Sequence, residues 1–315
     1  MLKVAFQMDE LQKLNFSTDS SYMIMHEAFK RNLEIYFYSP KTLSWVDNQV
    51  IAQIYKVTKV VDFKGLTKGI IPIQHEESVR YNLANLDFIF LRQDPPFDMA
   101  YITSTFLLEK LMPKVKIFNN PIGVRNAPEK LLVTNFSHLM PRTLISSDLA
   151  TINQFVQEEK ICVIKPLYGN AGSDVFFLRQ DDFNAKSIIE YFLHTFKEPI
   201  IVQAFIENIR LGDKRIILID GVIAGALNRL PGSNSIKSNI ASGGTARPTE
   251  LTPKDHLICS TISPILKELG LFFTGIDVID GYITEINVTS PTGLRLIQNL
   301  YGLDISVQIW DHILN

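Results

Sequence analysis

Two residues in the C-terminal third of the chain have the types and spacing of ligands for a cation. Glu285 and Asn287 stand two positions apart within residues 284–289, a stretch rich in β-branched residues that predicts a strand. Side chains alternate between the two faces of a strand, so Glu285 and Asn287 are expected on one face, with Ile286 and Val288 on the other. Carboxylate and carboxamide oxygens suit a hard cation such as magnesium.

A third oxygen ligand stands upstream, on a predicted partner strand over residues 271–279. A three-residue connection at 280–282 would place Asp277 opposite Glu285 on one face, whereas a two-residue Asp-Gly turn would place them on opposite faces. The first register gathers Asp277, Glu285 and Asn287 into one site. The pattern alone also fits the solvent face of a half-buried strand.

Lys165 ends an apolar stretch, residues 161–166, just before a loop that carries Gly169 and Gly172. A lysine at this place can hold phosphate oxygens, and glycines let backbone N–H groups approach them closely. Taken alone, the pattern also fits a tight hairpin with an exposed lysine. Lys130, taken alone, reads as a surface residue of a helix.

Two further segments contain residues that could contact a bound nucleotide. Residues 200–206 form an apolar strand that would lead from one module to the next, a hinge against which an adenine can lie. Arg215 begins a strand of the sheet expected to carry Asp277 and Glu285, where it can stabilise charge on a transferring phosphoryl group. A surface arginine at a strand end is the alternative.

Composition narrows the class of protein. The 315 residues are 46% hydrophobic and 20% charged with a net charge of −2, as in a globular protein, and nothing indicates nucleic acid or an anionic membrane as partner. No apolar run is long enough to span a bilayer, and residues 1–9 read as a first strand rather than a signal peptide. Cys162 and Cys259 stand in apolar surroundings, which favours buried reduced thiols in a cytosolic protein.

The order of predicted elements indicates an α/β and α+β chain in three parts: residues 1–122, 123–206 and 207–315. Strands alternate with helices in the first part, which predicts an open, mostly parallel sheet with Arg92 and Asn119 at strand ends, where ligands bind. It includes a hairpin of strands 45–50 and 53–60. A small α+β module follows, opened by a helix with Asn126 as N-cap. The last part is an antiparallel sheet flanked by helices, with a long loop at 230–244 and a helix capped at Thr252.

The linear order of these features is that of an ATP-grasp fold. They are Lys130, Lys165 with its glycine loop, the hinge strand at 200–206, Arg215, and Asp277 followed by Glu285 and Asn287. The chain resembles the bacterial glutathione synthetases over essentially its whole length. The segments that carry the resemblance are residues 91–98, 129–131, 164–167, 212–215, 239–244, 274–277 and 284–292.

The resemblance implies a role for each of these residues. Those expected to bind ATP are Lys130, Lys165, Gly169, Gly172, Gln203, Ala204, Phe205, Ile206 and Asp213, with Asp213 near the ribose. Asp277, Glu285 and Asn287 would hold magnesium or manganese. Arg215, Lys165 and Asn287 would act at the acyl-phosphate centre. Those expected to bind the other substrates are Arg92, Lys237, Asn239, Gly243, Ser290, Pro291 and Thr292.

Three positions depart from the family pattern. Ala171 stands where a glycine is expected, which restricts φ in the loop. Gln93 replaces a lysine after Arg92, and Lys237 replaces an arginine, which keeps the charge but loses bidentate binding of carboxylates.

The resemblance implies an ATP-dependent ligase that joins γ-glutamylcysteine to glycine through an acyl phosphate and releases ADP and phosphate. It also implies a cytoplasmic homo-oligomer and suggests a homotetramer. Gln93 and Lys237 support another carboxylate–amine ligase of the same fold as an alternative. A non-catalytic ATP-binding regulator is a further alternative, against which the retained Asp277, Glu285 and Asn287 argue.

Overall fold

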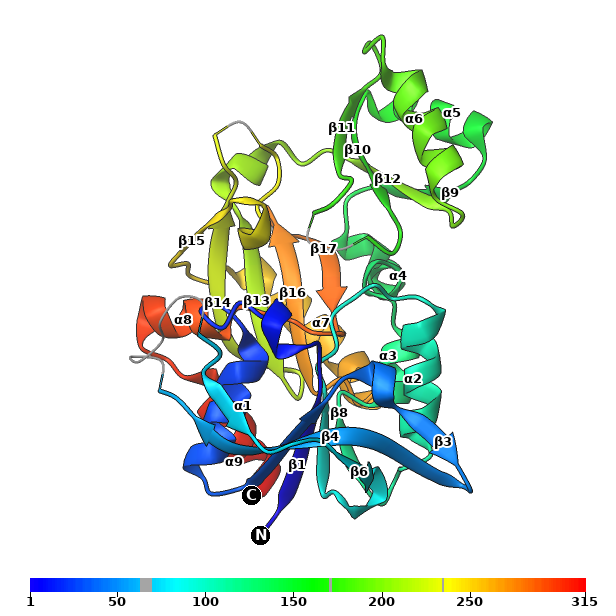
Figure 1. Ribbon diagram of the computed structural model, residues 1–315. Helices are drawn as coiled ribbons and strands as arrows, with labels where there is room; N and C mark the ends of the chain where they lie inside the picture. Colours follow the sequence, from blue (N-terminus) through cyan, green and yellow to red (C-terminus); the bar gives the residue numbers. More distant parts are fainter. Residues whose placement is uncertain (63–69, 170–171, 234) are drawn as a thin grey trace.

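The computed structural model describes residues 1–62, 70–169, 172–233 and 235–315 (Figure 1). Four parallel strands form the centre of the N-terminal sheet in the order β2-β1-β7-β8. They are β1 (Lys3–Gln7), β2 (Glu34–Tyr38), β7 (Phe88–Leu91) and β8 (Lys116–Phe118). Arg92 and Asn119 follow the carboxyl ends of two of these strands, where ligands bind in open parallel sheets, but both are buried. Asn119 donates to the carbonyl oxygens of Phe273 and Val288 and so joins this sheet to the C-terminal part.

An antiparallel extension widens this sheet beyond β2. It consists of β3 (Ser44–Val46), β4 (Gln49–Val60), β5 (Ile73–His75) and β6 (Val79–Asn82), all paired through β4. The predicted hairpin, with its turn at residues 51–52, is wrong about the position of the turn. Asp47 and Asn48 form the turn, with φ of 48° and 59°, and β4 runs unbroken from Gln49. Asp and Asn tolerate this left-handed backbone, which two-residue hairpin turns require.

Short polar residues cap the helices of the N-terminal part. The Asp19 carboxylate accepts from the Tyr22 amide at the start of α1 (Ser20–Lys30), and Asp98 caps α2 (Met99–Glu109) in the same way. Asn120 caps α3 (Pro121–Asn126), so the prediction of Asn126 as an N-cap is wrong. Asn126 ends α3, and α4 (Glu129–Leu132) begins after Pro128.

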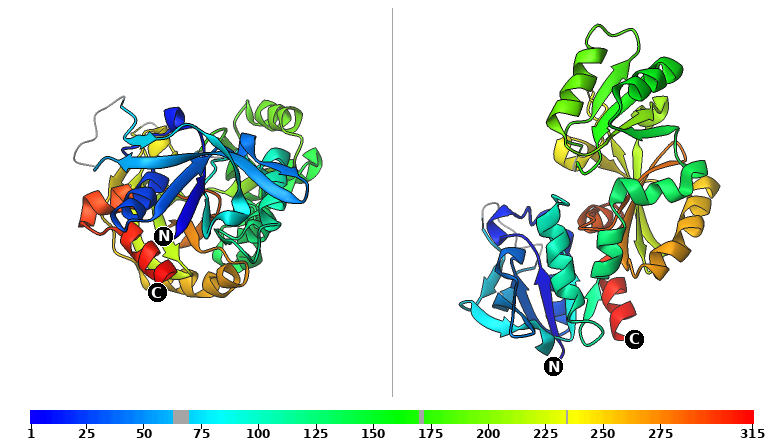
Figure 2. Two further views of the ribbon diagram at one scale, coloured as in Figure 1. Left: turned by 60° about the horizontal axis from the view of Figure 1, so that its bottom comes forward. Right: turned by 90° about the vertical axis from the view of Figure 1, so that its right-hand side faces the viewer.

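A small module stands apart from the rest of the molecule (Figures 1 and 2). Its antiparallel sheet has the order β11-β10-β12-β9 and is covered by two helices. The elements are β9 (Thr143–Ser146), α5 (Leu149–Glu159), β10 (Ile161–Pro166), β11 (Phe176–Arg179), α6 (Ala185–Thr195) and β12 (Ile200–Ala204). Its buried side chains, among them Ile152, Leu178 and Phe192, form a core of their own. We call residues 143–204 the lid module.

The C-terminal sheet is antiparallel, as predicted, and has the order β15-β14-β13-β16-β17. Its strands are β13 (Asp213–Ile219), β14 (Val222–Leu230), β15 (Thr245–Arg247), β16 (Phe273–Ile279) and β17 (Tyr282–Asn287). The helix α7 (Pro253–Glu268) packs on one face, and its predicted cap is confirmed by a capping box between Thr252 and Asp255. The helices α8 (Leu294–Tyr301) and α9 (Ile305–Leu314) pack on the other face and also against α1.

The hairpin of β16 and β17 has a register that neither sequence alternative contains. Its turn has two residues, Asp280 and Gly281, yet Asp277 lies opposite Glu285. A β-bulge reconciles the two facts, because Val278 pairs with Ile283 and Thr284 is the extra residue. The prediction that a two-residue turn would separate the carboxylates is therefore wrong.

Both cysteines, Cys162 and Cys259, are free and buried, as predicted. Among the described residues, no helix is long and apolar enough to cross a membrane. The boundaries of the three parts at residues 122 and 206 stay predictions.

Candidate functional site

A deep cleft separates the lid module from the C-terminal sheet, with an empty volume of about 910 Å³ that includes solvent at its mouth. We call it the first cleft. Of the residues predicted to bind ATP or a metal, those that line it are Lys130, Lys165, Gly169, Gly172, Gln203, Ala204, Phe205, Ile206, Asp213, Asp277 and Glu285. The structure thus brings together residues that the sequence separates by up to about 155 positions.

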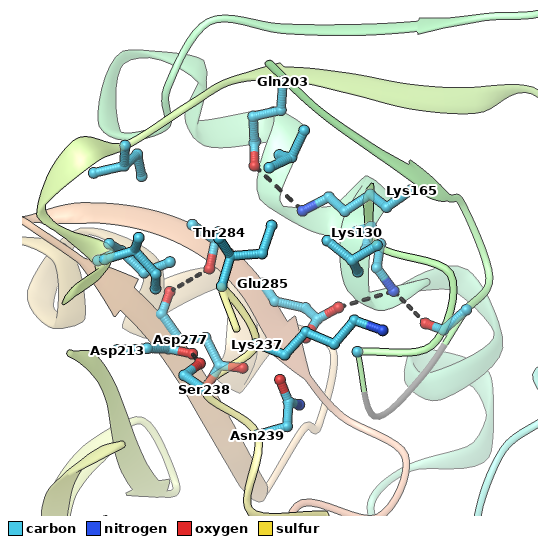
Figure 3. A pocket seen from close by; sticks show the side chains of 18 of the residues that line it. Lys130, Lys165, Gln203, Asp213, Lys237, Ser238, Asn239, Asp277, Thr284 and Glu285 are labelled. Carbon is cyan, nitrogen blue, oxygen red and sulfur yellow. Dashed lines mark hydrogen bonds and ion pairs between the residues drawn. The ribbon is translucent and has the colours of Figure 1, made fainter. Parts of the chain in front are cut away.

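Lys165 lies on the lid side of the first cleft and binds a neutral partner. Its Nζ donates to Gln203 Oε1 at 3.2 Å (Figure 3). Gln203 in turn donates to Thr143 Oγ1 at 2.7 Å. Burial lowers the pKa of Lys165 to about 8, although the Glu285 carboxylate opposes this shift. An anion in the cleft would therefore stabilise the charged form of this lysine.

Lys130 lies on the opposite wall and is already paired with an anion. Its Nζ stands 2.9 Å from Glu285 Oε1 and also donates to the carbonyl oxygen of Gly169 (Figure 3). Burial alone would lower the pKa of Lys130, but the Glu285 carboxylate outweighs burial and raises it. Lys130 thus ties the glycine loop of the lid to the β17 carboxylate.

The first cleft also has an apolar wall, which the hinge strand supplies. Its side chains come from Ala204, Phe205 and Ile206, with Val163 from β10 and Ile279 from β16. A flat heteroaromatic ring fits between such walls, while the two lysines at the other side suit phosphates.

A buried charge network contributes Asp213 and Asp277 to the lining of the first cleft. Arg215 binds Asp277 with two bonds, Nε–Oδ1 at 2.6 Å and Nη2–Oδ2 at 2.9 Å. Arg229 bridges Asp277, at 2.9 Å, and Asp213, at 2.5 Å. Burial would raise the pKa of the Asp277 carboxyl, but the two guanidinium groups outweigh burial and hold it well below its usual range. Asp277 is therefore ionised at neutral pH.

A second cleft adjoins the first on the side of the N-terminal part, and we call it the second cleft. Its lining includes the predicted residues Arg215, Asn287, Ser290, Pro291 and Thr292, together with Asp94 and Pro95 from the N-terminal part. Asn239 and Glu285 line both clefts. A group bound in one cleft can therefore meet a group bound in the other at Glu285.

Three predicted substrate residues lie elsewhere than expected. Arg92 is buried beneath the second cleft without lining it, and it donates to Pro291 O at 3.0 Å and to Ser21 Oγ at 2.9 Å. Lys237 lines the first cleft rather than the second (Figure 3). In the part of the chain that the structure describes, Gly243 lines neither cleft. Ala171 lies outside the described residues. Their roles toward substrate stay predictions.

The side-chain oxygens on β16 and β17 fit a cation that takes its remaining ligands from a bound substrate and water. Asp277 and Glu285 face the same way across the hairpin, and Asn287 Nδ2 lies 3.3 Å from Asp277 Oδ2. Among the described residues, no group of three His, Cys, Asp or Glu could enclose a metal by itself. Magnesium commonly takes only one or two carboxylates and fills its remaining positions with phosphate oxygens and water, so this donor set fits it.

Sequence reasoning missed two charged residues of the site. Arg229 lies one residue before the end of β14 and is 4% exposed, and no motif singles it out. Glu129 precedes Lys130, and its Oε1 accepts from the amides of Val288 and Thr289 at 2.9 and 3.1 Å and from Thr289 Oγ1 at 2.9 Å. Glu129 thereby holds the start of the segment that walls the second cleft. The only signal for it was its place beside Lys130.

Solved structures with this fold define the class of protein. D-cycloserine synthetase DcsG aligns over 99% of this chain and 100% of its own with a TM-score of 0.68 at 13% identity. A RimK domain protein ATP-grasp from Sphaerobacter thermophilus aligns over 99% and 100% with a TM-score of 0.62 at 15% identity. The fold is that of the ATP-grasp proteins.

Sequence relatives then give the family. The model of the prokaryotic glutathione synthetase N-terminal domain matches residues 2–125, and that of the ATP-grasp domain matches residues 129–302. Glutathione synthetases of Rhodopseudomonas palustris and Bradyrhizobium diazoefficiens are 48% and 47% identical, each over 99% of this chain and 98% of their own. That of Synechocystis is 38% identical over 98% of both. The chain belongs to the prokaryotic glutathione synthetase family.

Proposed function

We propose that this protein joins γ-glutamylcysteine to glycine to form glutathione, with ATP converted to ADP and phosphate. The observation that carries the proposal is the meeting of the two clefts at Glu285 and Asn239 in a chain of this family. A phosphate donor in the first cleft and a carboxylate in the second would meet beside Lys130, Arg215 and Asn287. Such an arrangement serves group transfer by positioning and charge stabilisation.

The reaction balances in two steps. A carboxylate oxygen of the cysteinyl residue attacks the γ-phosphorus of ATP, and ADP leaves with the electron pair of the broken P–O bond. The glycine nitrogen then attacks the acyl carbon, phosphate leaves, and the nitrogen gives up a proton. No protein nucleophile is required, and the free thiols of Cys162 and Cys259 are buried, with pKa values raised by burial to about 12.

ATP would occupy the first cleft. Lys130 and Lys165 would hold its phosphates with the backbone at Gly169 and Gly172, and the adenine would lie against the wall of residues 203–206. Asp213 would lie near the ribose, held by Arg229 and by Ser238 Oγ at 2.5 Å. A phosphate beside Lys165 would offset the burial that lowers the pKa of this lysine.

The peptide would occupy the second cleft, with Arg215 and Asn287 at the reacting carboxylate and Ser290, Pro291 and Thr292 along its length. Arg92 would support this wall from below through its bond to Pro291 O. Lys237, Asn239 and Gly243 would reach the substrates from the loop above.

Magnesium or manganese would be held by Asp277, Glu285 and Asn287. When bound, such an ion neutralises charge on the transferring phosphoryl group. Arg215 and Arg229 keep Asp277 ionised and oriented, and the ion pair with Lys130 orients Glu285. We also propose that the protein is a cytoplasmic homo-oligomer, and its mass from light scattering would distinguish a tetramer from a smaller assembly.

Release of ADP tests the proposal. Purified protein is mixed with ATP, magnesium and γ-glutamylcysteine, with and without glycine, and glutathione is identified by mass spectrometry. ADP release that requires both substrates, with glutathione as product, is expected. ATP binding without this turnover would overturn the assignment of the substrates.

Another carboxylate–amine ligase is the second candidate, because Gln93 and Lys237 depart from the family pattern. Gln93 is 9% exposed and accepts from Gln7 Nε2 at 2.9 Å, so it acts within the N-terminal part rather than on a ligand directly. A panel of γ-glutamyl peptides and amine acceptors distinguishes the two candidates.

A further inference from the structure

One aromatic contact joins the walls of the two clefts. The rings of Phe97 and Tyr168 stack with centroids 6.1 Å apart and an interplanar angle of 22°. Phe97 follows Asp94 and Pro95, which line the second cleft, and Tyr168 immediately precedes Gly169, which lines the first. Among the described residues, this is the ring contact that links the N-terminal part to the lid module.

Each ring is tied to its own cleft. Phe97 also packs on Tyr101, a fully buried residue of α2, with centroids 5.2 Å apart. On the other side, Lys130 Nζ donates to the carbonyl oxygen of Gly169, next to Tyr168, and pairs with Glu285 at 2.9 Å. A path of chain neighbours, the ring contact and the Lys130 hydrogen bond thus runs from Asp94 and Pro95 of the second cleft to the lysine of the first.

The junction also has room to respond to a ligand. A small cavity of about 290 Å³ of empty space lies between the two segments, lined by Pro95, Phe97, Tyr168, Gly169 and Lys130 among others. Tyr168 is 37% exposed, so the contact is not part of a buried core. A partly exposed aromatic pair can bias the position of a side chain without being needed for folding.

We propose that Tyr168 is a positioning residue that couples the two clefts, so that peptide in the second cleft strengthens nucleotide binding in the first. Peptide that settles against Asp94 and Pro95 fixes Phe97, which fixes Tyr168 and the Gly169 carbonyl, and thereby the amine of Lys130. By linkage, nucleotide strengthens peptide binding by the same factor. The choice of peptide rests on the function proposed above.

Calorimetry with a non-hydrolysable ATP analogue measures this coupling. The Kd of the analogue is determined with magnesium, with and without saturating γ-glutamylcysteine and without glycine. In the wild type we expect the peptide to tighten binding about fivefold or more, as is typical of coupled sites. Tyr168→Leu should reduce this factor to about one, and Tyr168→Phe should keep it because the ring is retained.

Matched variants separate coupling from a general loss of structure. Tyr191→Leu removes another tyrosine of the lid module, one that is 52% exposed, and should leave the factor unchanged. Phe97→Leu should lose the factor as Tyr168→Leu does, and the double variant should lose no more. Tyr168→Leu with a wild-type factor would overturn the proposal, and so would a wild type without coupling.

A second readout does not depend on the identity of the peptide. Hydrogen exchange at the amides of Phe97 and Asp98 should slow when the ATP analogue alone binds the wild type or Tyr168→Phe, but not when it binds Tyr168→Leu. Unchanged exchange in the wild type would refute the coupling. Slowed exchange in a wild type that makes no glutathione would refute the proposed substrates and leave the coupling standing.

Discussion

Lys165 in the first cleft and the arginines of the buried network, Arg215 and Arg229, are held in contrasting ways. Lys165 is half-buried beside a neutral amide, and its pKa is lowered to about 8. Arg215 and Arg229 share Asp277, and the pair of Arg229 with Asp213 completes a network of matched charges. The lysine has donors to offer an anionic ligand, whereas the arginines are already committed to carboxylates.

The contrast indicates a division of labour between binding and positioning. An incompletely paired cation gains most from an incoming phosphate, because the ligand replaces the hydration that burial removed. A buried network with its charges matched is rigid and costly to break, so it orients Asp277 in advance. Ligand binding by Lys165 is therefore expected to depend on pH. Mutation of the arginine–aspartate network is expected to lower the free energy of unfolding.

The largest expected effect comes from breaking the matched network. Asp277→Ala leaves two buried guanidinium groups without this partner and should lower the free energy of unfolding by about 3–5 kcal/mol. Urea denaturation followed by circular dichroism measures the change. Asp181→Ala breaks an exposed pair with Arg179 and should change the midpoint little. Equal effects from the two variants would contradict the contrast.

Substitution of Glu285, which lines both clefts, is expected to change stability less than Asp277→Ala does but to lower the rate strongly. Glu285→Gln keeps the shape of the side chain but removes the charge that pairs with Lys130 and would hold the metal. Turnover should fall about 100-fold through lost positioning, with the circular dichroism spectrum unchanged. The exposed Glu268→Gln serves as control. Turnover near that of the wild type would refute the metal assignment.

The pKa of Lys165 predicts a dependence of ATP affinity on pH. Above pH 8 this lysine loses its proton in the free protein and must regain it to hold phosphate, so affinity should fall by up to about tenfold per pH unit. Calorimetry at pH 7, 8 and 9 measures it, with the surface variant Lys186→Met as control. In Lys165→Met this part of the dependence should vanish, and its persistence would assign it to another group.

The same shift has a defined sign for stability. Between pH 8 and the unfolded pKa of about 10.5, the unfolded chain binds the Lys165 proton and the folded chain does not. The contribution of this residue to stability therefore rises with pH across that window. Subtracting the urea midpoints of Lys165→Met from those of the wild type across this window isolates the contribution, and a decline with rising pH would contradict it.

The smallest effect is expected at the cysteines. Burial raises the pKa of Cys162 and Cys259 to about 12, so native protein should react with a thiol reagent far more slowly than protein in urea. Absorbance of the released aromatic thiolate follows the reaction. A native thiol that reacts as fast as in urea would show that one of these sites opens.

The fold was largely predictable because its elements carry local signals. Alternating apolar residues marked the strands, Thr252 marked a helix start, and the glycine loop marked one wall of the first cleft. The extra residue at Thr284 had no such signal, because a bulge depends on how two strands meet and not on either strand alone. Arg229 was missed for a related reason: its partners Asp213 and Asp277 lie on other strands.

The packing of α9 against α1 has a consequence for how the chain is made. Trp310 on α9 is fully buried and donates from Nε1 to Ile24 O on α1 at 2.8 Å, and the two helices lie side by side (Figure 1). A ribosome releases the N-terminal strands long before α9. Until α9 emerges, the apolar face of the N-terminal sheet and α1 lacks part of its covering. The lid module has its own core and can fold as soon as it emerges.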